Sequence, residues 1–470
     1  MAEPHVVVIG GGIAGLTAAL LSSGGRRVTL LEASERLGGK LRGGEVGGVR
    51  VDLGAESMLA RRPEGVDLAR QVGLGEQLEP PSTAKAAIWT RDALRPLPGG
   101  QLMGVPGDLA ALAASGVLSD EGLRRARQEE RTPEVGADIA IGDYVAARLG
   151  REVVDRLVEP LLGGVYAGQT SEISLRAAVP ALLPIARGGG PLVAGVHELV
   201  GRAQNGGSAG PVFQGLRGGL GTLPEAVAAA CLRAGADLRT GSPVDELRRT
   251  PEGWRVVSNG EVLHADAVVL AVPAPQAARL LRAEAPGAAA ELQAVEYAGM
   301  ALVTMAFHRA DLAEPLPGSG FLVPPVDGRA IKASTFSSNK WGWLDRSAPD
   351  AFLLRTSLGR HREEEVLDLP DEELVARSLA DLGEAVGLRA QPYDTTVTRW
   401  LAGLPQYPVG HLDRVARIRA QVAGLGGLAV CGAAYDGVGI PACIASARRA
   451  VNEVLTPGTG AGVSEGTMGA

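Results

Sequence analysis

One stretch near the start of the chain, His5-Val6-Val7-Val8-Ile9-Gly10-Gly11-Gly12-Ile13-Ala14-Gly15, decides the fold. A short run of β-branched residues ends at three glycines, and an Ala/Leu-rich pattern typical of a helix follows. The spacing of Gly10, Gly12 and Gly15 matches G-x-G-x-x-G, which predicts a strand, a tight turn and a helix that bind a dinucleotide. The helix N-terminus would direct free N–H groups at the pyrophosphate. The residues predicted to line the turn are Gly10, Gly11, Gly12, Ile13, Ala14 and Gly15.

A second apolar run ends at an acid, at the spacing that the same motif requires. Arg27-Val28-Thr29-Leu30-Leu31 is followed by Glu32 and Ala33, and Glu32 comes about 20 residues after the glycine turn. A carboxylate at this place can accept hydrogen bonds from a ribose hydroxyl. We therefore predict that Glu32 and Ala33 contact the nucleotide, which at this point could carry a nicotinamide or a flavin.

A second glycine pair lies between two basic residues in the next loop. Arg36, Gly38, Gly39 and Lys40 would place cations and bare backbone beside the same pyrophosphate. This element resembles flavoproteins of the amine oxidase and protoporphyrinogen oxidase group, and nicotinamide dehydrogenases generally lack it. The pair therefore favours a flavin nucleotide, FAD, as the cofactor.

Composition excludes several classes of protein. The chain has 470 residues, a formal charge of −7 and three cysteines, Cys231, Cys431 and Cys443. The negative charge argues against a nucleic-acid partner, and three cysteines without metal-ligand spacing predict buried thiols in a reducing compartment. Six scattered histidines give no metal site. Because no signal peptide and no run of about 18 apolar residues is evident, we expect a cytoplasmic protein without a membrane span.

The most specific resemblance lies in the middle of the chain. Glu159-Pro160-Leu161-Leu162-Gly163-Gly164-Val165-Tyr166-Ala167-Gly168 is similar to a motif of protoporphyrinogen oxidase and of oxygen-dependent coproporphyrinogen III oxidase. The resemblance implies that Gly164 and Tyr166 form a wall of the substrate cleft. From the residues alone, a packing turn between helices remains an alternative. The family has Asp after Tyr-Ala-Gly, where this chain has Gln169.

The same resemblance implies three further contacts with FAD. The glycine turn that begins at Gly54, after a short strand, would lie along the isoalloxazine ring. The backbone at Val244 would contact adenine. The late glycine turn from Gly432 to Gly439, with the helix after it, would face the pyrimidine end of the flavin. The family has Asp where this chain has Ala442 in that helix. The residues concerned are Gly54, Ala55, Glu56, Ser57, Val244, Trp400, Gly432, Val438, Gly439 and Ile440.

The fold class expected is mixed α/β. It comprises a Rossmann-like FAD-binding domain assembled from discontinuous segments, an inserted helical domain and a sheet-plus-helix substrate domain, because the nucleotide-binding stretches lie at both ends and in the middle of the chain. The expected ranges are 1–80, 211–284 and 396–455 for the FAD-binding domain, 95–205 for the helical domain, 81–94 and 285–395 for the substrate domain, and 456–470 for a disordered tail.

The resemblance implies oxidation of a porphyrinogen by oxygen in haem biosynthesis. No catalytic side chain is expected, because the flavin N5 would take the hydride. A porphyrinogen carries carboxylates, so cations are expected around it. The chosen candidates are Arg62, Lys85 and Lys340, and Lys332 and Arg355 are further cations near the cleft. Transient contact with the next enzyme of the haem pathway is also expected.

Several alternatives remain open at this point. Coproporphyrinogen III is preferred as substrate because a soluble tetra-acid needs no membrane-facing entrance, and the chain shows no evident apolar surface helix. Protoporphyrinogen IX is the alternative within the family. More distant alternatives are an amine oxidase, a polyene desaturase, or a non-enzymatic protein similar to the prenyl-GTPase escort proteins.

Overall fold

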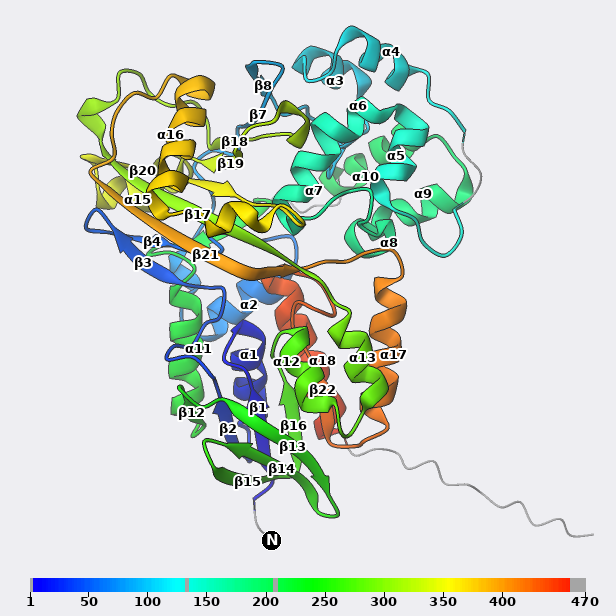
Figure 1. Ribbon diagram of the computed structural model, residues 1–470, viewed down its shortest axis with the longest axis vertical. Helices are drawn as coiled ribbons and strands as arrows, with labels where there is room; N and C mark the ends of the chain where they lie inside the picture. Colours follow the sequence, from blue (N-terminus) through cyan, green and yellow to red (C-terminus); the bar gives the residue numbers. More distant parts are fainter. Residues whose placement is uncertain (1–2, 132–134, 206–209, 457–470) are drawn as a thin grey trace, which may run out of the picture.

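The computed structural model describes residues 3–131, 135–205 and 210–456, so the predicted disordered tail lies outside them from residue 457 onward. Figure 1 shows two parts, a parallel sheet between helices in its lower half and a second sheet beside a group of helices in its upper half. The mixed α/β class predicted from the sequence is confirmed.

The parallel sheet draws its strands from both ends and the middle of the chain. Its order is β12-β2-β1-β16-β22, and every neighbouring pair is parallel. The bounds are β1 (His5–Ile9), β2 (Arg27–Leu31), β12 (Asp237–Arg239), β16 (Ala267–Leu270) and β22 (Leu428–Val430). Because parallel strands bring their carboxyl ends to one edge, the loops after β1, β2 and β22 meet there.

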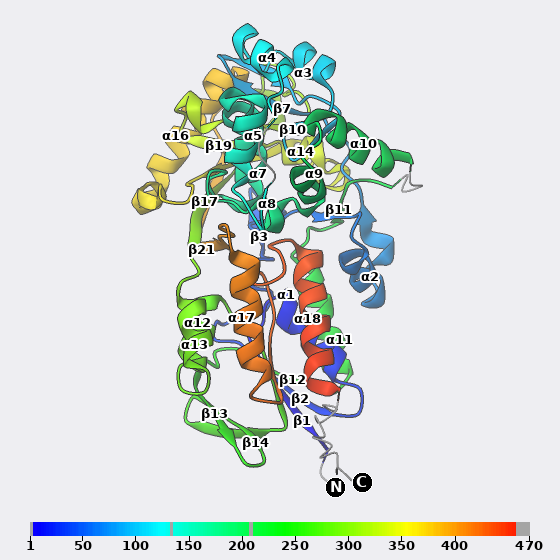
Figure 2. The same ribbon diagram turned by 90° about the vertical axis from the view of Figure 1, so that its right-hand side faces the viewer.

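Helices cover both faces of this sheet (Figure 2). Along β1, Val6 and Val8 pack in one apolar core, and Val7 and Ile9 pack in another on the opposite face. This pattern explains why the strand is an unbroken apolar run in sequence. The helices on the first face are α1 (Ile13–Ser22), α11 (Thr222–Arg233) and α18 (Ile440–Leu455), and those on the second are α12 (Ala274–Leu281), α13 (Pro286–Gln293) and α17 (His411–Ala423).

A small antiparallel sheet of β13 (Val244–Thr250), β14 (Gly253–Ser258) and β15 (Glu261–Ala265) packs on the second face. The Asn259-Gly260 dipeptide between two strand-like runs predicts a hairpin, and the antiparallel pairing of β14 and β15 confirms it. Both residues have positive φ, 50° and 79°, as a two-residue turn between twisted strands requires.

The second large sheet has the order β21-β17-β20-β19-β18-β7-β8. One face packs on α16 (Asp371–Val386), and the other packs partly on the hairpin of β3 (Gly43–Val46) and β4 (Val49–Asp52). The predicted domain boundaries stay a prediction, although β21 continues across the one placed between residues 395 and 396. The strands are β7 (Ala86–Thr90), β8 (Ala93–Pro96), β17 (Tyr297–His308), β18 (Gly320–Leu322), β19 (Ile331–Thr335), β20 (Ala351–Leu358) and β21 (Asp394–Pro405).

The helical region holds the motif that resembles the porphyrinogen oxidases. A π-helical turn at Val154–Val158, which the sequence did not predict, leads directly into α7 (Glu159–Tyr166). Extra residues of this kind in a helix occur often at functional sites. The other helices are α3 (Leu109–Ser115), α4 (Asp120–Arg127), α5 (Ile141–Leu149), α6 (Arg151–Val153), α8 (Leu175–Ala178), α9 (Leu183–Gly188) and α10 (Leu192–Asn205).

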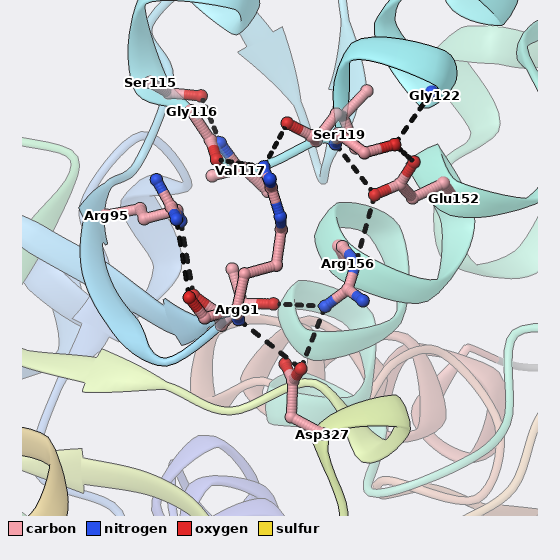
Figure 3. Close-up of polar contacts among 12 residues, drawn as sticks. Arg91, Arg95, Ser115, Gly116, Val117, Ser119, Gly122, Glu152, Arg156 and Asp327 are labelled. Carbon is pink, nitrogen blue, oxygen red and sulfur yellow. Dashed lines mark hydrogen bonds and ion pairs between the residues drawn. The ribbon is translucent and has the colours of Figure 1, made fainter.

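Arg156 in the π-helical turn ties the helical region to the second sheet (Figure 3). Its guanidinium donates to Thr90 Oγ1 of β7 at 2.6 Å and to Asp327 Oδ1 at 2.9 Å, and it pairs with Glu152 at 3.2 Å. These groups are largely shielded from water, with 17–24% of each charged side chain exposed. The contact therefore fixes the start of α7 relative to the sheet.

We expect Arg156→Met to lower the free energy of unfolding by about 2 kcal/mol, because it removes charged hydrogen bonds between largely buried groups. Arg151→Met is the matched control, since Arg151 is 60% exposed and pairs with Asp155 in its own helical stretch. The control should cost less than about 1 kcal/mol. Urea unfolding of both variants measures the difference, and equal losses would show that Arg156 is an ordinary surface cation.

Candidate functional site

The first glycine turn contains glycines with different physical requirements. Gly10 has φ +108°, and a Cβ at Gly15 would lie 1.8 Å from the Gly10 carbonyl oxygen, so neither position tolerates a side chain. At Gly12 a Cβ would meet no atom within 4 Å. Gly10 and Gly15 are therefore required for packing, whereas Gly12 borders open space at the N-terminus of α1. A cradle that a Cβ would fill suits a pyrophosphate.

Glu32 holds the base of this cradle. Its Oε2 accepts from the Gly11 N–H at 2.6 Å, and its Oε1 accepts from the Ser34 N–H at 2.9 Å. Ala33 lies exposed beside it. Oε1 also accepts from the Ser34 hydroxyl at 2.7 Å, whereas Oε2 can accept a further hydrogen bond, so these contacts leave Glu32 able to bind a ribose hydroxyl. No side chain caps the N-terminus of α1, where Ile13 and Ala14 lie.

The second glycine loop folds directly onto the first. The Gly38 N–H donates to the Gly11 carbonyl at 2.8 Å, and a Cβ at Gly39 would lie 3.1 Å from the Gly12 Cα. The Arg36 guanidinium donates to the Gly39 carbonyl at 2.6 Å. The two loops thus form one surface of bare backbone, as the sequence predicted from their glycines.

Lys40 supplies a cation at this surface. Its ammonium lies 5.8 Å from the centre of the Tyr297 ring, and burial lowers its pKa. Within the described residues no carboxylate forms an ion pair with it. A buried ammonium without a protein anion is unfavourable by itself and is compensated by an anionic ligand. The donor set beside the cradle therefore fits the diphosphate of a flavin nucleotide.

The glycine turn after β4 is fixed from several sides. A Cβ at Gly54 would lie 2.1 Å from the Lys40 carbonyl oxygen, so the turn rests on the second glycine loop. The Trp400 indole N–H donates to the Leu53 carbonyl at 3.1 Å. Ala55 and Ser57 are half-buried. This arrangement joins the turn to the cradle through backbone contacts.

Glu56 in the same turn is 7% exposed and neutralises two cations. Lys340 Nζ lies 2.5 Å from Oε1, and Arg355 Nε lies 3.3 Å from Oε2. Burial opposes ionisation, but the two cations outweigh it and lower the pKa of Glu56. Arg355 also donates to the Gly54 carbonyl at 2.7 Å. Lys340 and Arg355, which the sequence suggested for substrate carboxylates, therefore already have an anionic partner.

The late glycine turn follows β22 and begins α18. Gly432 has φ +117° and Gly439 precedes the first turn of α18, with Val438 half-buried and Ile440 buried beside it. Its anchor, Asp436, was missed in the sequence. The Asp436 carboxylate accepts from Arg419 of α17 at 2.6 Å and from Arg449 of α18 at 3.1 Å. The sequence feature that could have revealed this role of Asp436 is an acid inside a glycine turn with arginines in the flanking helices.

Val244, the residue predicted to lie at the adenine, is buried at the start of β13. Its carbonyl oxygen accepts a hydrogen bond from the Arg279 guanidinium. The strand end is thus held from α12, in the part of the chain that packs on the parallel sheet.

The porphyrinogen-oxidase motif forms a wall at the C-terminal half of α7. The Cβ position of Gly164 lies 3.7 Å from Leu322 of β18, so the helix and the sheet approach closely there. Tyr166 is buried 5.6 Å from the Tyr407 ring, and burial raises its pKa to about 12. Gln406 donates to the Tyr166 carbonyl at 2.8 Å. These contacts give the wall one fixed position.

Arg62 lies near the late glycine turn, since its charge acts on Cys443 at the start of α18, whereas Lys85 does not join the residues above. Arg62 pairs with Glu64 at 2.7 Å, at the start of α2 (Pro63–Gln71). Lys85 is exposed and lines a hollow of about 430 Å³ with Arg309 and Asn339. None of the other predicted site residues lines that hollow.

The three cysteines, Cys231, Cys431 and Cys443, are buried free thiols, as the sequence predicted. Burial raises the pKa of the Cys443 thiol to about 11. Across residues 3–131, 135–205 and 210–456, no group of three or more His, Cys, Asp or Glu could hold a metal ion.

We expect Gly12→Val to fold normally but to purify without flavin, because its Cβ would meet no protein atom within 4 Å and its side chain would enter the cradle. Gly15→Val is the matched contrast, since its side chain meets the Gly10 carbonyl and should destabilise the fold by several kcal/mol, on the order of an overpacked core. Visible absorption reports the flavin and thermal unfolding reports the fold. A yellow Gly12→Val protein with normal flavin content would contradict the placement of the cradle.

Comparison with known proteins shows the family of the chain. The family model of flavin containing amine oxidoreductases matches residues 13–455. A coproporphyrinogen III oxidase of Mycobacterium tuberculosis is 38% identical and aligns over 95% of this chain and 96% of its own length. A coproporphyrinogen III oxidase of Bacillus subtilis is 32% identical over 97% and 98%.

A solved structure is also similar. A protein from Exiguobacterium sp. 255-15, named provisionally as a protoporphyrinogen oxidase, superposes with a TM-score of 0.85 and 32% identity over 97% of this chain and 99% of its own. Among the residues the structure describes, no helix has the length and apolarity needed to cross a membrane. On these grounds the chain belongs to the flavin containing amine oxidoreductase family.

Proposed function

We propose that this chain is an FAD-dependent oxidase that converts coproporphyrinogen III to coproporphyrin III with molecular oxygen, in haem biosynthesis. One observation carries the proposal. The Tyr407 hydroxyl donates to the carbonyl of Ala433 in the late glycine turn, and its ring packs on Tyr166 of the α7 wall. Val438 of the same turn packs on the apolar core that holds both tyrosines. The cofactor turn and the wall for a flat substrate are therefore neighbours.

The proposed contacts with FAD follow the geometry of the glycine loops. Gly12, Gly38, Gly39 and the first turn of α1 would hold the pyrophosphate, with Lys40 as counter-charge and Glu32 at the ribose. Gly54, Ala55, Glu56, Ser57 and Trp400 would flank the isoalloxazine ring, Gly432, Val438, Gly439 and Ile440 its pyrimidine end, and Val244 the adenine. When bound, FAD would accept a hydride, which carries the two electrons removed in each cycle.

The side chains would orient the substrate rather than transfer protons. Conversion of a porphyrinogen to a porphyrin removes six electrons and six hydrogens, so three cycles consume three oxygen molecules and release three molecules of hydrogen peroxide. Gly164 and Tyr166 would form one wall of the cleft, and catalysis would depend on how closely the macrocycle is held to the flavin.

Arg62, Lys85 and Lys340 remain the proposed substrate contacts from the sequence. Lys340 is the weakest of these three candidates, because Glu56 already neutralises the charge of its ammonium in a largely buried site. Protoporphyrinogen IX is the second candidate substrate, favoured by the provisional name of the Exiguobacterium structure. Contact with the next enzyme of the haem pathway also remains a proposal.

We expect the purified protein to oxidise coproporphyrinogen III with a higher kcat/KM than protoporphyrinogen IX, in buffer without detergent. Porphyrin fluorescence measures the rate, and a peroxide assay should give three molecules of hydrogen peroxide for each porphyrin. Removal of oxygen, with no other acceptor added, should stop turnover. A clear preference for protoporphyrinogen IX would reverse the assignment of the substrate, and unchanged anaerobic turnover would overturn oxygen as acceptor.

A further inference from the structure

Lys332 is a buried cation that the contacts described so far do not use. It lies on β19, only 7% of the residue is exposed, and its ammonium donates to the neutral Gly359 carbonyl at 2.7 Å. Throughout the part of the chain that the structure describes, no carboxylate forms an ion pair with it. Burial, assisted by neighbouring Arg360, lowers its pKa to about 7.

Arg360 adds a second cation to the same place. Its side chain is 14% exposed, donates to the Val323 carbonyl at 3.3 Å and pairs with Glu363 at 3.6 Å. Glu363 is 54% exposed and is a weak counter-charge. The negative charge of Glu159 in α7 raises the pKa of Arg360. The Glu159 carboxylate, however, already accepts a hydrogen bond from the Thr170 N–H. The nearby carboxylates therefore do not fully neutralise the positive charges of Lys332 and Arg360.

The pair lies beside the α7 wall. The His361 N–H, one residue after Arg360, donates to the Ala167 carbonyl at the end of α7 at 2.7 Å. The Val323 N–H donates to the Lys332 carbonyl at 2.9 Å, and Leu322, the residue before Val323, is the one that approaches Gly164. A molecule seated against Gly164 would therefore have both cations within reach of its edge.

We propose that Lys332 and Arg360 form a binding site for a carboxylate of the substrate, a propionate of the porphyrinogen. The inference rests on the proposed function, because the carboxylate belongs to that substrate. A planar guanidinium and an ammonium match two oxygens of one carboxylate. The ligand would supply the negative charge that the protein lacks, and a buried charge gains most from such a partner.

The test compares Lys332→Met and Arg360→Met with Arg202→Met, a matched loss of one cation from the exposed face of α10. Fluorescence titration of the flavin-loaded protein with coproporphyrin III gives Kd, and oxidation of coproporphyrinogen III gives KM and kcat. We expect Kd and KM to rise about ten- to a hundredfold in the first two variants, as for a lost charged hydrogen bond, with a smaller change in kcat.

Thermal unfolding separates this role from a structural one. Lys332→Met removes an uncompensated buried charge, so Tm should stay level or rise. Lys332→Arg should restore much of the affinity because a cation remains. KM of the wild type should rise from pH 6 to pH 8 as Lys332 loses its proton, because only the ammonium attracts the carboxylate. The guanidinium of Arg360 stays charged over that range, so the dependence should vanish in Lys332→Met and Lys332→Arg.

The result also identifies the carboxylate. Equal losses with protoporphyrin IX would place the contact on a propionate common to both porphyrins, whereas losses confined to coproporphyrin III would place it on one of the two additional propionates. Unchanged Kd in both variants, or a fall in Tm parallel to the rise in KM, would overturn the site. If the wild type oxidises no porphyrinogen, the proposed function fails instead, and the two failures are thereby distinguished.

Discussion

The rest of the cofactor site depends on one contact between two glycines. Because Gly15 has no Cβ, helix α1 can lie on the Gly10 carbonyl and leave the sheet immediately after β1. That position opens the space at Gly12, and the second glycine loop then closes on the first through the bond from Gly38 to Gly11. The Gly54 turn rests in turn on the second loop. These three layers of the site thus meet one another through bare backbone.

Several cations that are at least partly shielded from water differ in their partners. Lys340 and Arg355 share Glu56, and Arg419 and Arg449, which are 27% and 29% exposed, share Asp436, so the protein itself neutralises these four charges and they hold turns in place. Lys40 and Lys332 lack such a partner among the described residues. An uncompensated buried charge is costly, which is why we propose that ligands supply the missing negative charge at Lys40 and Lys332. A count of positive residues in the sequence cannot separate these two kinds of cation.

Prediction from the sequence succeeded where structure is determined locally. The β1–α1–β2 unit and the Asn259-Gly260 turn follow from residue spacing and turn chemistry. It failed where the decisive partner is distant. Glu56 and Lys340 are 284 positions apart, so nothing near either residue reveals their pairing. The π-helical turn before α7 was missed for another reason, because an extra residue in a helix leaves no distinct apolar pattern.

The parallel sheet also dictates when the protein can be completed during synthesis. Strand β1 is central and has β16 as one neighbour, which in turn pairs with β22 at residues 428–430. At about 5–20 residues per second on a ribosome, β1 waits on the order of tens of seconds for these partners. Its apolar strand and glycine turn are exposed during that interval, with no finished cradle to receive a nucleotide. Cofactor capture is therefore a late event, coupled to the arrival of the last strand and α18.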